Sequence, residues 1–303
     1  MADTSVDIIE NVILKPYTTF KAGGPAKYFA EPNSVAEVIE LINYARDNNI
    51  KYFVLGAGSN ILISDKGYDG LVIRLGRNFS SIIYTDDGEY GEIKSAAGTS
   101  LALLGNKCTE EGLEGAEFSC GIPGSVGGAV YMNAGAYGSE IKNIAKEVTY
   151  LKDGEVFTKS VDECDFGYRH SIFETEEYKD AVVLSLTIRL PKGDKQVIKA
   201  KVDELKAKRC ASQPVEVPSA GSTFKRPTGY FAGTLIQENG LKGFKLDESG
   251  AQVSPKHAGF VVNNGGSASA SDILKLINYV SDTVFEKTGV RLEPEVKMVG
   301  EWN

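Results

Sequence analysis

The sequence predicts a soluble globular protein that mixes helices with strands and has room for two or three domains. Its 303 residues are 42% hydrophobic and 24% charged, and no run of eighteen apolar residues could form a membrane span. Segments with apolar residues at helical spacing alternate with short β-rich runs that end in turn residues. Glycine is the one compositional outlier, because 33 residues are about 11% of the chain, against roughly 7% in average usage. The excess is concentrated in a few loops, which are therefore the first candidates for function.

The charge and the N-terminal residues argue against several partners and locations. A formal net charge of -8 lacks the basic field that binding to a nucleic-acid backbone requires. The first seven residues carry acids and no apolar core, which argues against a secretory signal. We therefore expect a cytoplasmic protein with no nucleic-acid partner and no membrane insertion.

The cysteines are far apart in the sequence: Cys108, Cys120, Cys164 and Cys210. There is no C-x-x-C pair, and the chain has only two histidines, so the spacing suggests neither a zinc site nor a disulfide framework. We predict reduced, buried thiols and no metal site.

The first eighty residues predict a small β-α-β-β unit. Ser34 and Glu37 have the spacing of a capping box, and apolar residues follow at helical period up to residue 48. Strands are predicted around this helix at residues 26–30, 50–55 and 71–75.

The second of these strands runs directly into the loop Gly56-Ala57-Gly58-Ser59-Asn60. Loops of this kind bind nucleotide phosphates, because bare backbone N–H groups can approach an anion that side chains would obstruct. The dinucleotide fingerprint G-x-G-x-x-G fails, however, because Ile61 stands where the third glycine is required and no helical pattern follows. The sequence therefore does not predict a Rossmann fold.

A second glycine-rich segment covers residues 121–138, with six glycines among eighteen residues. Its other residues are mostly apolar, which is unlike a flexible linker and indicates a loop that must approach another group closely. The alternative is a tightly packed helical segment of small residues. Ser125 is not the nucleophile of a hydrolase elbow, because Pro123 occupies a position that requires glycine.

The elements around this segment follow from ordinary local signals. A helix is expected from a Thr99 cap to Gly112. The turn Asp153-Gly154 predicts a hairpin. Further strands are expected at residues 81–84, 92–97, 181–190, 257–263 and 290–299, and further helices at 194–209, 230–239 and 269–289.

Three polar positions outside the glycine loops are candidates for chemistry. Ser222 follows Gly221 in a predicted exposed loop, where a serine hydroxyl could take part in chemistry. The alternative is an ordinary polar turn without a function. Arg169 lies between Tyr168 and a histidine, and its planar guanidinium can bind the two oxygens of a carboxylate or phosphate. The alternative is an ordinary surface residue, which an isolated arginine usually is. Glu295 follows Pro294, which has no backbone N–H to donate to a neighbouring strand. The strand that carries both residues is therefore predicted to lie at the edge of a sheet or to contain a bulge.

Six motifs occur in order along the chain and together resemble the UDP-N-acetylenolpyruvoylglucosamine reductase family. The resemblance covers roughly residues 12–300. The motifs are Thr18-Thr19-Phe20-Lys21-Ala22-Gly23-Gly24, the Gly56 to Asn60 loop, the run from Gly121 to Gly138, Tyr168-Arg169-His170-Ser171, Gly221-Ser222-Thr223-Phe224-Lys225 and Leu292-Glu293-Pro294-Glu295-Val296.

The resemblance implies an α+β protein with the para-cresol methylhydroxylase-type FAD fold in two subdomains, residues 1–80 and 81–200, and a substrate-binding domain at 201–303. It implies non-covalent FAD, since neither glycine loop holds a histidine, with NADPH as co-substrate. The implied cofactor-binding positions are Gly56, Ala57, Gly58, Ser59, Asn60, Gly121, Gly124, Ser125, Gly127, Gly128 and Gly135.

The resemblance also implies the reaction and its residues. FAD takes a hydride from NADPH and passes it from N5 to C3 of the enolpyruvyl group, which leaves negative charge on C2 and its carboxylate. Arg169 and Glu295 match the positions that polarise this carboxylate, and Ser222 matches the proton donor to C2. A carboxyl group can help an anion only while it holds a proton, so we expect burial to raise the pKa of Glu295. Glu293 is the competing acid.

Four further positions are predicted to contact the UDP-sugar substrate: Tyr168, Arg209, Arg226 and His257. Other family members can carry amides at the positions of Arg226 and His257. The chain lacks the extra tyrosine-bearing substrate loop of one family branch, which suggests the shorter type, and Lys225 has no assigned role. The alternatives are another oxidase or dehydrogenase of the same flavin fold, and a flavin- or nucleotide-binding regulatory module without catalysis.

Overall fold

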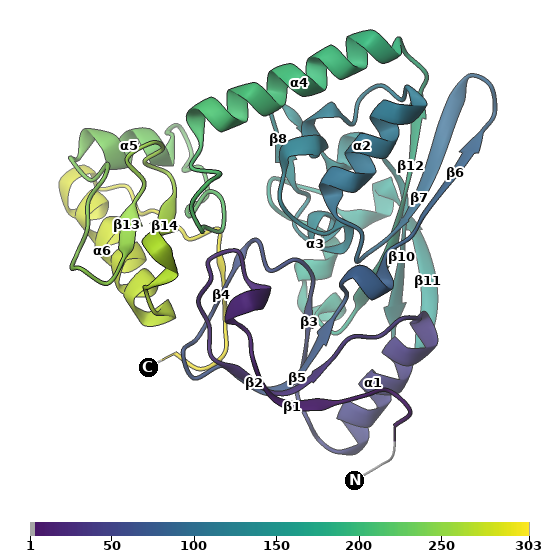
Figure 1. Ribbon diagram of the computed structural model, residues 1–303, viewed down its shortest axis with the longest axis horizontal. Coiled ribbons are helices and arrows are strands. Elements are labelled where there is room, and N and C mark those ends of the chain that lie inside the picture. Colours follow the sequence, from purple (N-terminus) through teal and green to yellow (C-terminus); the bar gives the residue numbers. More distant parts are fainter. Residues whose placement is uncertain (1–3, 303) are drawn as a thin grey trace. The chain divides into compact units, whose positions relative to one another are not determined.

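The computed structural model describes residues 4–302, which divide into two compact units (Figure 1). The first unit comprises the described residues up to 8, with 30–57 and 73–208; the second comprises 9–29, 58–72 and the described residues from 209. The expected domain limits at residues 80 and 200 stay a prediction. Residues 1–3, which belong to the segment used to exclude a secretory signal, lie outside the described residues. No helix within residues 4–302 is long and apolar enough to cross a bilayer.

The first unit is built on a five-stranded antiparallel sheet. In order, its strands are β11 (Glu155–Ser160), β10 (Ala145–Lys152), β12 (Val182–Pro191), β7 (Tyr90–Ala96) and β6 (Ile82–Asp86). Asp153 and Gly154, both at positive φ, join β10 to β11, which confirms the predicted hairpin. The short helix α3 (Val126–Tyr131) packs against β12 and β7, and α2 (Leu101–Glu111) packs against α3 (Figure 1).

The helices of the first unit begin where hydroxyl side chains cap them. Ser34 accepts a hydrogen bond from the N–H of Glu37 at 3.2 Å and starts α1 (Val35–Asp47), which precedes β3 (Tyr52–Leu55). Ser100, rather than the predicted Thr99, caps α2, because its Oγ accepts from the N–H of Leu103. The prediction was wrong by one residue, since Thr99 is itself buried and points its hydroxyl to the carbonyl of Ser81.

The glycine-rich segment is partly helical. The alternative of tightly packed small residues is therefore correct for residues 126–131, where Ser125 caps α3 by accepting from the N–H of Gly128. Gly127 lies so close to Ala97 that a side chain would meet the Ala97 methyl group at 2.9 Å. Glycine is needed here for packing of α3 against its neighbours.

The second unit contains short strands and two well-defined helices. β1 (Ile9–Ile13) pairs with β2 (Pro25–Ala30), and β2 neighbours β5 (Tyr68–Arg74). In a second sheet, β4 (Ile61–Ile63) pairs in parallel with β15 (Lys297–Val299). In a third, β13 (Ala251–Val253) pairs with β14 (Val261–Asn263). Helix α4 (Lys195–Ser212) carries the chain from the first unit into the second, and α5 (Ala232–Glu238) and α6 (Ala270–Thr288) follow. The core of this unit includes Phe20, Leu62 and Ile277, all fully buried.

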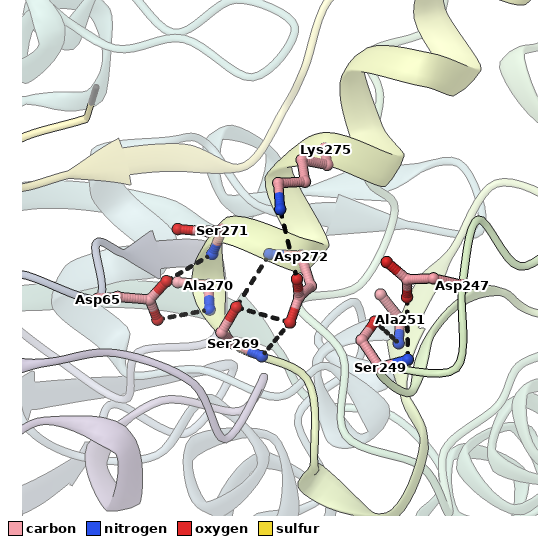
Figure 2. Close-up of polar contacts among 9 residues, drawn as sticks. All are labelled: Asp65, Asp247, Ser249, Ala251, Ser269, Ala270, Ser271, Asp272 and Lys275. Atoms are coloured by element: carbon pink, nitrogen blue, oxygen red, sulfur yellow. Dashed lines mark hydrogen bonds and ion pairs between the residues drawn. The ribbon is translucent and has the colours of Figure 1, made fainter.

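The start of α6 is held by two acidic side chains (Figure 2). Ser269 and Asp272 form a capping box, and the two oxygens of Asp65 accept from the N–H groups of Ala270 and Ser271, each at 2.8 Å. Burial raises the pKa of Asp65, but hydrogen bonds from Ser271 and Ala270 outweigh it and leave the pKa below its ordinary value. The carboxylate therefore ties the segment after β4 to the helix.

Two strands predicted in the second half of the chain are shorter than expected, and one cysteine predicted to be buried is exposed. The strand predicted at 257–263 is reduced to β14, because His257 and Phe260 close a turn through a hydrogen bond from the N–H of Phe260 to the carbonyl of His257. The strand predicted at 290–299 is reduced to β15, and Pro294 forms only an isolated bridge with Phe224. Cys210 is exposed, whereas the other three cysteines are buried as predicted.

Candidate functional site

The two glycine-rich loops meet within the first unit. A side chain on Gly56 would overlap Oγ of Ser125, so the residue that begins the first loop contacts the residue that caps α3. Ser125 is itself buried, and its Oγ is occupied by the N–H of Gly128. Only glycine allows this approach, which explains the residue type at position 56.

Backbone donors without an internal acceptor gather at this contact. Among residues 4–302, the N–H groups of Gly56, Ala57, Gly124 and Ser125 donate no hydrogen bond to the protein. The N–H groups of Gly127 and Gly128, in contrast, are used by Ala97 and Ser125. Unpaired backbone donors at converging loops suit the oxygens of a phosphate or diphosphate, so the first four residues fit that group best.

The remaining residues of the first loop belong to the second unit. Gly58 has a positive φ of 63°, and a side chain there would overlap the carbonyl of Tyr17. Its own carbonyl accepts from the N–H of Thr19 at 3.0 Å. The glycine therefore lets the loop lie against the Thr18-Thr19 segment, the first of the six motifs.

Arg169 lies in a tight turn in the first unit. Gly167 and His170 exchange two backbone hydrogen bonds of 3.0 and 3.2 Å, and Arg169 has a left-handed backbone with a φ of 52°. The guanidinium donates to the carbonyl of Gly135 at 3.1 Å and lies 5.3 Å from the centre of the Tyr168 ring. Tyr168 is 54% exposed, so the turn presents an aromatic ring and a cation side by side.

The loop of Ser222 pairs with the segment of Glu295 through backbone hydrogen bonds in the second unit. The N–H of Glu295 donates to the carbonyl of Thr223 at 2.8 Å, and the N–H of Lys225 donates to the carbonyl of Glu293 at 2.9 Å. Ser222 is exposed, and among the described residues its hydroxyl has no hydrogen-bond partner. The loop therefore offers a hydroxyl that is available to a ligand.

The two candidate acids differ in their surroundings. Glu295 is only 7% exposed, whereas the side chain of Glu293 is 68% exposed and pairs with Nζ of Lys225 at 2.5 Å. Burial disfavours the charged form of a carboxyl group, so Glu295 is the better candidate for a neutral acid. The ion pair also gives Lys225 a role that the sequence left open.

Asn60 connects the first glycine loop to the candidate acid. Its Nδ2 donates to the carbonyl of Glu295 at 3.2 Å, and its carbonyl accepts from the N–H of Lys297 at 3.0 Å. These contacts continue the parallel pairing of β4 with β15. The last residue of the loop and the segment that carries Glu295 are thus hydrogen-bonded to each other within the second unit.

The predicted substrate-binding residues of the second unit are all accessible. Arg226 is exposed and stacks over the Phe231 ring at 4.0 Å, and Arg209 is half-buried in the last turn of α4. His257 is half-buried beside Phe260, and its Nδ1 accepts from the N–H of Gly259 at 3.1 Å. Burial lowers the pKa of His257, which favours the neutral ring in which Nδ1 accepts and Nε2 donates.

The lowered pKa of His257 predicts a pH-dependent stability. Because the pKa is lower in the folded than in the unfolded protein, its contribution is complete above the ordinary value of about 6.5 and is lost as pH falls through the folded-state pKa. We expect the melting temperature of the wild type to fall more between pH 7 and pH 5 than that of His257→Gln. Parallel melting curves would contradict this expectation.

The structure therefore groups the predicted residues within each unit. Arg169 and Tyr168 lie beside the end of the glycine-rich segment, and the loop of Ser222 pairs with the segment of Glu295. Sequence reasoning missed Asn133, a buried residue between the segment and the arginine turn, although an asparagine within an apolar, glycine-rich run was a visible signal. No group of three or more potential metal ligands occurs among the described residues.

Two protein-family models match this chain. Residues 26–159 match the model of the FAD-binding domain family, and residues 213–299 match that of the C-terminal domain of UDP-N-acetylenolpyruvoylglucosamine reductase. The reductase of Agathobacter rectalis is 48% identical, covering 97% of this chain and 95% of the relative, and that of Clostridium novyi is 46% identical, covering 97% and 93%.

Solved structures show the same fold. The crystal structure of the reductase from Thermus caldophilus matches with a TM-score of 0.79 at 34% identity and covers 97% of this chain and 98% of that one. A solvent-stable cholesterol oxidase matches 62% of this chain and 38% of its own, with a TM-score of 0.50 at 14% identity, which concerns the fold alone. The predicted α+β fold of the para-cresol methylhydroxylase type is confirmed. The chain belongs to the family of UDP-N-acetylenolpyruvoylglucosamine reductases, which are FAD-dependent oxidoreductases.

Proposed function

We propose that this protein reduces the enolpyruvyl group of UDP-N-acetylenolpyruvoylglucosamine to give UDP-N-acetylmuramate, with NADPH as reductant, in the cytoplasmic synthesis of peptidoglycan precursors. Bound FAD would supply the hydride that adds to C3 of the enolpyruvyl group. The residues of the chain then have two tasks: to hold the cofactor and the substrate, and to stabilise the negative charge and deliver the proton at C2.

The observation that carries this proposal is the hydrogen-bonded pairing of the Ser222 loop with the segment of Glu295. The bond between the N–H of Glu295 and the carbonyl of Thr223 pairs the backbone next to the exposed Ser222 with that of the buried Glu295, which supports a role for both residues in one reaction. The hydroxyl donates a proton to C2, and a neutral Glu295 donates a hydrogen bond to the substrate carboxylate as charge develops there. An enzyme that only oxidised a small alcohol would need neither group.

The first unit supplies the complementary contacts. The N–H groups of Gly56, Ala57, Gly124 and Ser125 would bind the diphosphate of FAD, which explains how its charge is balanced without a lysine in either loop. Arg169 polarises the substrate carboxylate, because its planar fork can donate two parallel hydrogen bonds to two oxygens.

The remaining substrate contacts are assigned to accessible side chains. Tyr168, Arg209, Arg226 and His257 bind the UDP-sugar. A neutral His257 would donate from Nε2, since Nδ1 is already an acceptor for Gly259. This resembles the donor capacity of an amide, the residue type that other family members carry at this position.

A turnover assay tests the proposed reaction. With FAD bound, we expect NADPH oxidation to depend on the enolpyruvyl nucleotide and the product to be heavier than the substrate by two hydrogens in mass spectrometry. Oxygen consumption with small alcohols or sugars and no reaction with the nucleotide would indicate another oxidase of the fold. Retention of FAD with no turnover of any substrate would indicate a binding module.

The contact between Gly56 and Ser125 gives a prediction for cofactor binding. The methyl group of Gly56→Ala would displace Ser125 and the N–H groups beside it, so we expect FAD affinity to fall about tenfold or more. Titration of apoprotein with FAD, followed by flavin fluorescence, measures this loss. Because Ser125→Ala removes the Oγ that the new methyl group would meet, FAD affinity should differ less between Gly56→Ala/Ser125→Ala and Ser125→Ala than between Gly56→Ala and the wild type. Wild-type affinity in Gly56→Ala would contradict the proposed cradle.

A further inference from the structure

The turn that carries Arg169 is tied to the end of the glycine-rich segment at three alternate residues. The hydroxyl of Ser171 donates to the carbonyl of Tyr131 at 2.6 Å, and Nδ2 of Asn133 donates to the carbonyl of Gly167 at 2.8 Å. The third tie is the bond from the Arg169 guanidinium to Gly135. All of these residues belong to the first unit.

Asn133 is a buried tie whose side-chain amide is fully hydrogen-bonded. Its side chain is 0% exposed, and besides Gly167 its Nδ2 donates to a carboxylate oxygen of Glu140 at 2.9 Å. Its Oδ1 accepts from the N–H of Lys142 at 3.0 Å. A buried amide with both donors and its acceptor satisfied holds its partners in one geometry, because each lost bond would leave a buried polar group unpaired.

The backbone of the turn requires such support. Arg169 has a φ of 52°, a conformation that non-glycine residues adopt at some energetic disadvantage. The carbonyl of Gly167, at the base of the turn, accepts from both His170 and Asn133. Without Asn133, the turn would keep its internal bonds and the ties of Ser171 and Arg169 but lose the hydrogen bond from a buried amide to the carbonyl at its base.

We propose that Asn133 is a positioning residue that fixes the guanidinium of Arg169 relative to the glycine-rich segment that binds the cofactor. This role rests on the proposed function for its effect on the reaction, and on contacts within the first unit for its effect on the turn. Asn133 touches neither substrate nor reacting atoms; it acts through Gly167 and the orientation of Arg169.

The test is Asn133→Gly, which removes the amide but accepts the positive φ of 46° at this position. The matched control is Asp153→Gly, an exposed residue of the β10–β11 turn with a φ of 52°. Loss of the buried tie should increase local opening, and hence trypsin cleavage after Arg169, about tenfold in the apoprotein, with no change in the control. Mass spectrometry of the fragments measures the cleavage.

The same variants separate the reaction from the fold. With FAD bound, Asn133→Gly should be reduced by NADPH at the wild-type rate but react with the enolpyruvyl substrate about tenfold more slowly, since only that step uses Arg169. Wild-type cleavage and wild-type kinetics in Asn133→Gly would overturn the inference. If even the wild type fails to react with this substrate, the proposed function fails, and the trypsin result alone decides the inference.

A second variant covers the case in which Asn133→Gly does not fold. Asn133→Asp keeps the size and the acceptor for Lys142, but it removes the donor and places a carboxylate beside the carbonyl of Gly167 and the carboxylate of Glu140. We expect the same faster cleavage and slower substrate reaction. Wild-type behaviour in both assays would again overturn the role of Asn133.

Discussion

Replacing Ser222 by alanine should slow the reaction of the reduced enzyme with the enolpyruvyl substrate by about 10²–10⁴-fold, the usual range for loss of a general acid. Reduction of the enzyme by NADPH should stay close to the wild-type rate, because that half-reaction requires no proton at C2. Anaerobic stopped-flow absorbance at the flavin band measures both rates separately.

The surroundings of Ser222 allow its hydroxyl to be removed without a change in the fold. Ser222 is exposed and its hydroxyl has no partner among the described residues, so its loss should not disturb packing or leave a buried group unpaired. Thr228→Ala, at another exposed position of the same loop, is the matched control and should react normally in both steps. Equal slowing of both half-reactions in Ser222→Ala would assign the serine to the fold or to cofactor binding instead.

Replacing Glu295 by glutamine should have the second-largest effect, a loss of roughly 10²-fold in the substrate half-reaction. Glutamine keeps the size of the side chain and leaves the backbone bond to Thr223 intact, but an amide is a weaker donor than a neutral carboxyl group. Anaerobic stopped-flow absorbance of the NADPH-reduced variant mixed with the enolpyruvyl substrate measures this loss.

Glu293→Gln is the control for this prediction. Glu293 is exposed and pairs with Lys225, so its replacement removes a surface ion pair, which contributes little to stability. We expect the Glu293 variant to keep the wild-type rate of the substrate half-reaction. A large loss in Glu293→Gln, with little change in Glu295→Gln, would exchange the roles of the two acids.

Most of the fold followed from local signals in the sequence. The helix after Ser34, the Asp153-Gly154 hairpin and the long helix that ends at Gly289 all begin or end at residues whose side chains or backbone freedom dictate the boundary. The absence of a helix after Asn60 was also predictable, because β4 lacks a helical apolar pattern. These features depend on neighbours in sequence, which is why a single chain suffices to predict them.

The features that the sequence did not predict depend on contacts between distant residues. The strand expected at 290–299 is short because its first part pairs with the Ser222 loop, some seventy residues earlier, through isolated bonds rather than a ladder. The hydrogen bonds of Asn60 and Asn133 likewise require the structure, since each side-chain amide donates to a backbone carbonyl far along the chain. Motif order identified the candidate residues; only the fold showed which of them are buried or paired.

The most direct test of the central claim is an anaerobic titration of the wild-type protein carrying FAD. We expect NADPH to bleach the yellow flavin absorbance and one equivalent of UDP-N-acetylenolpyruvoylglucosamine then to restore it, with formation of one equivalent of UDP-N-acetylmuramate. Reduced protein that stays bleached with this nucleotide but regains its colour with oxygen would contradict the claim.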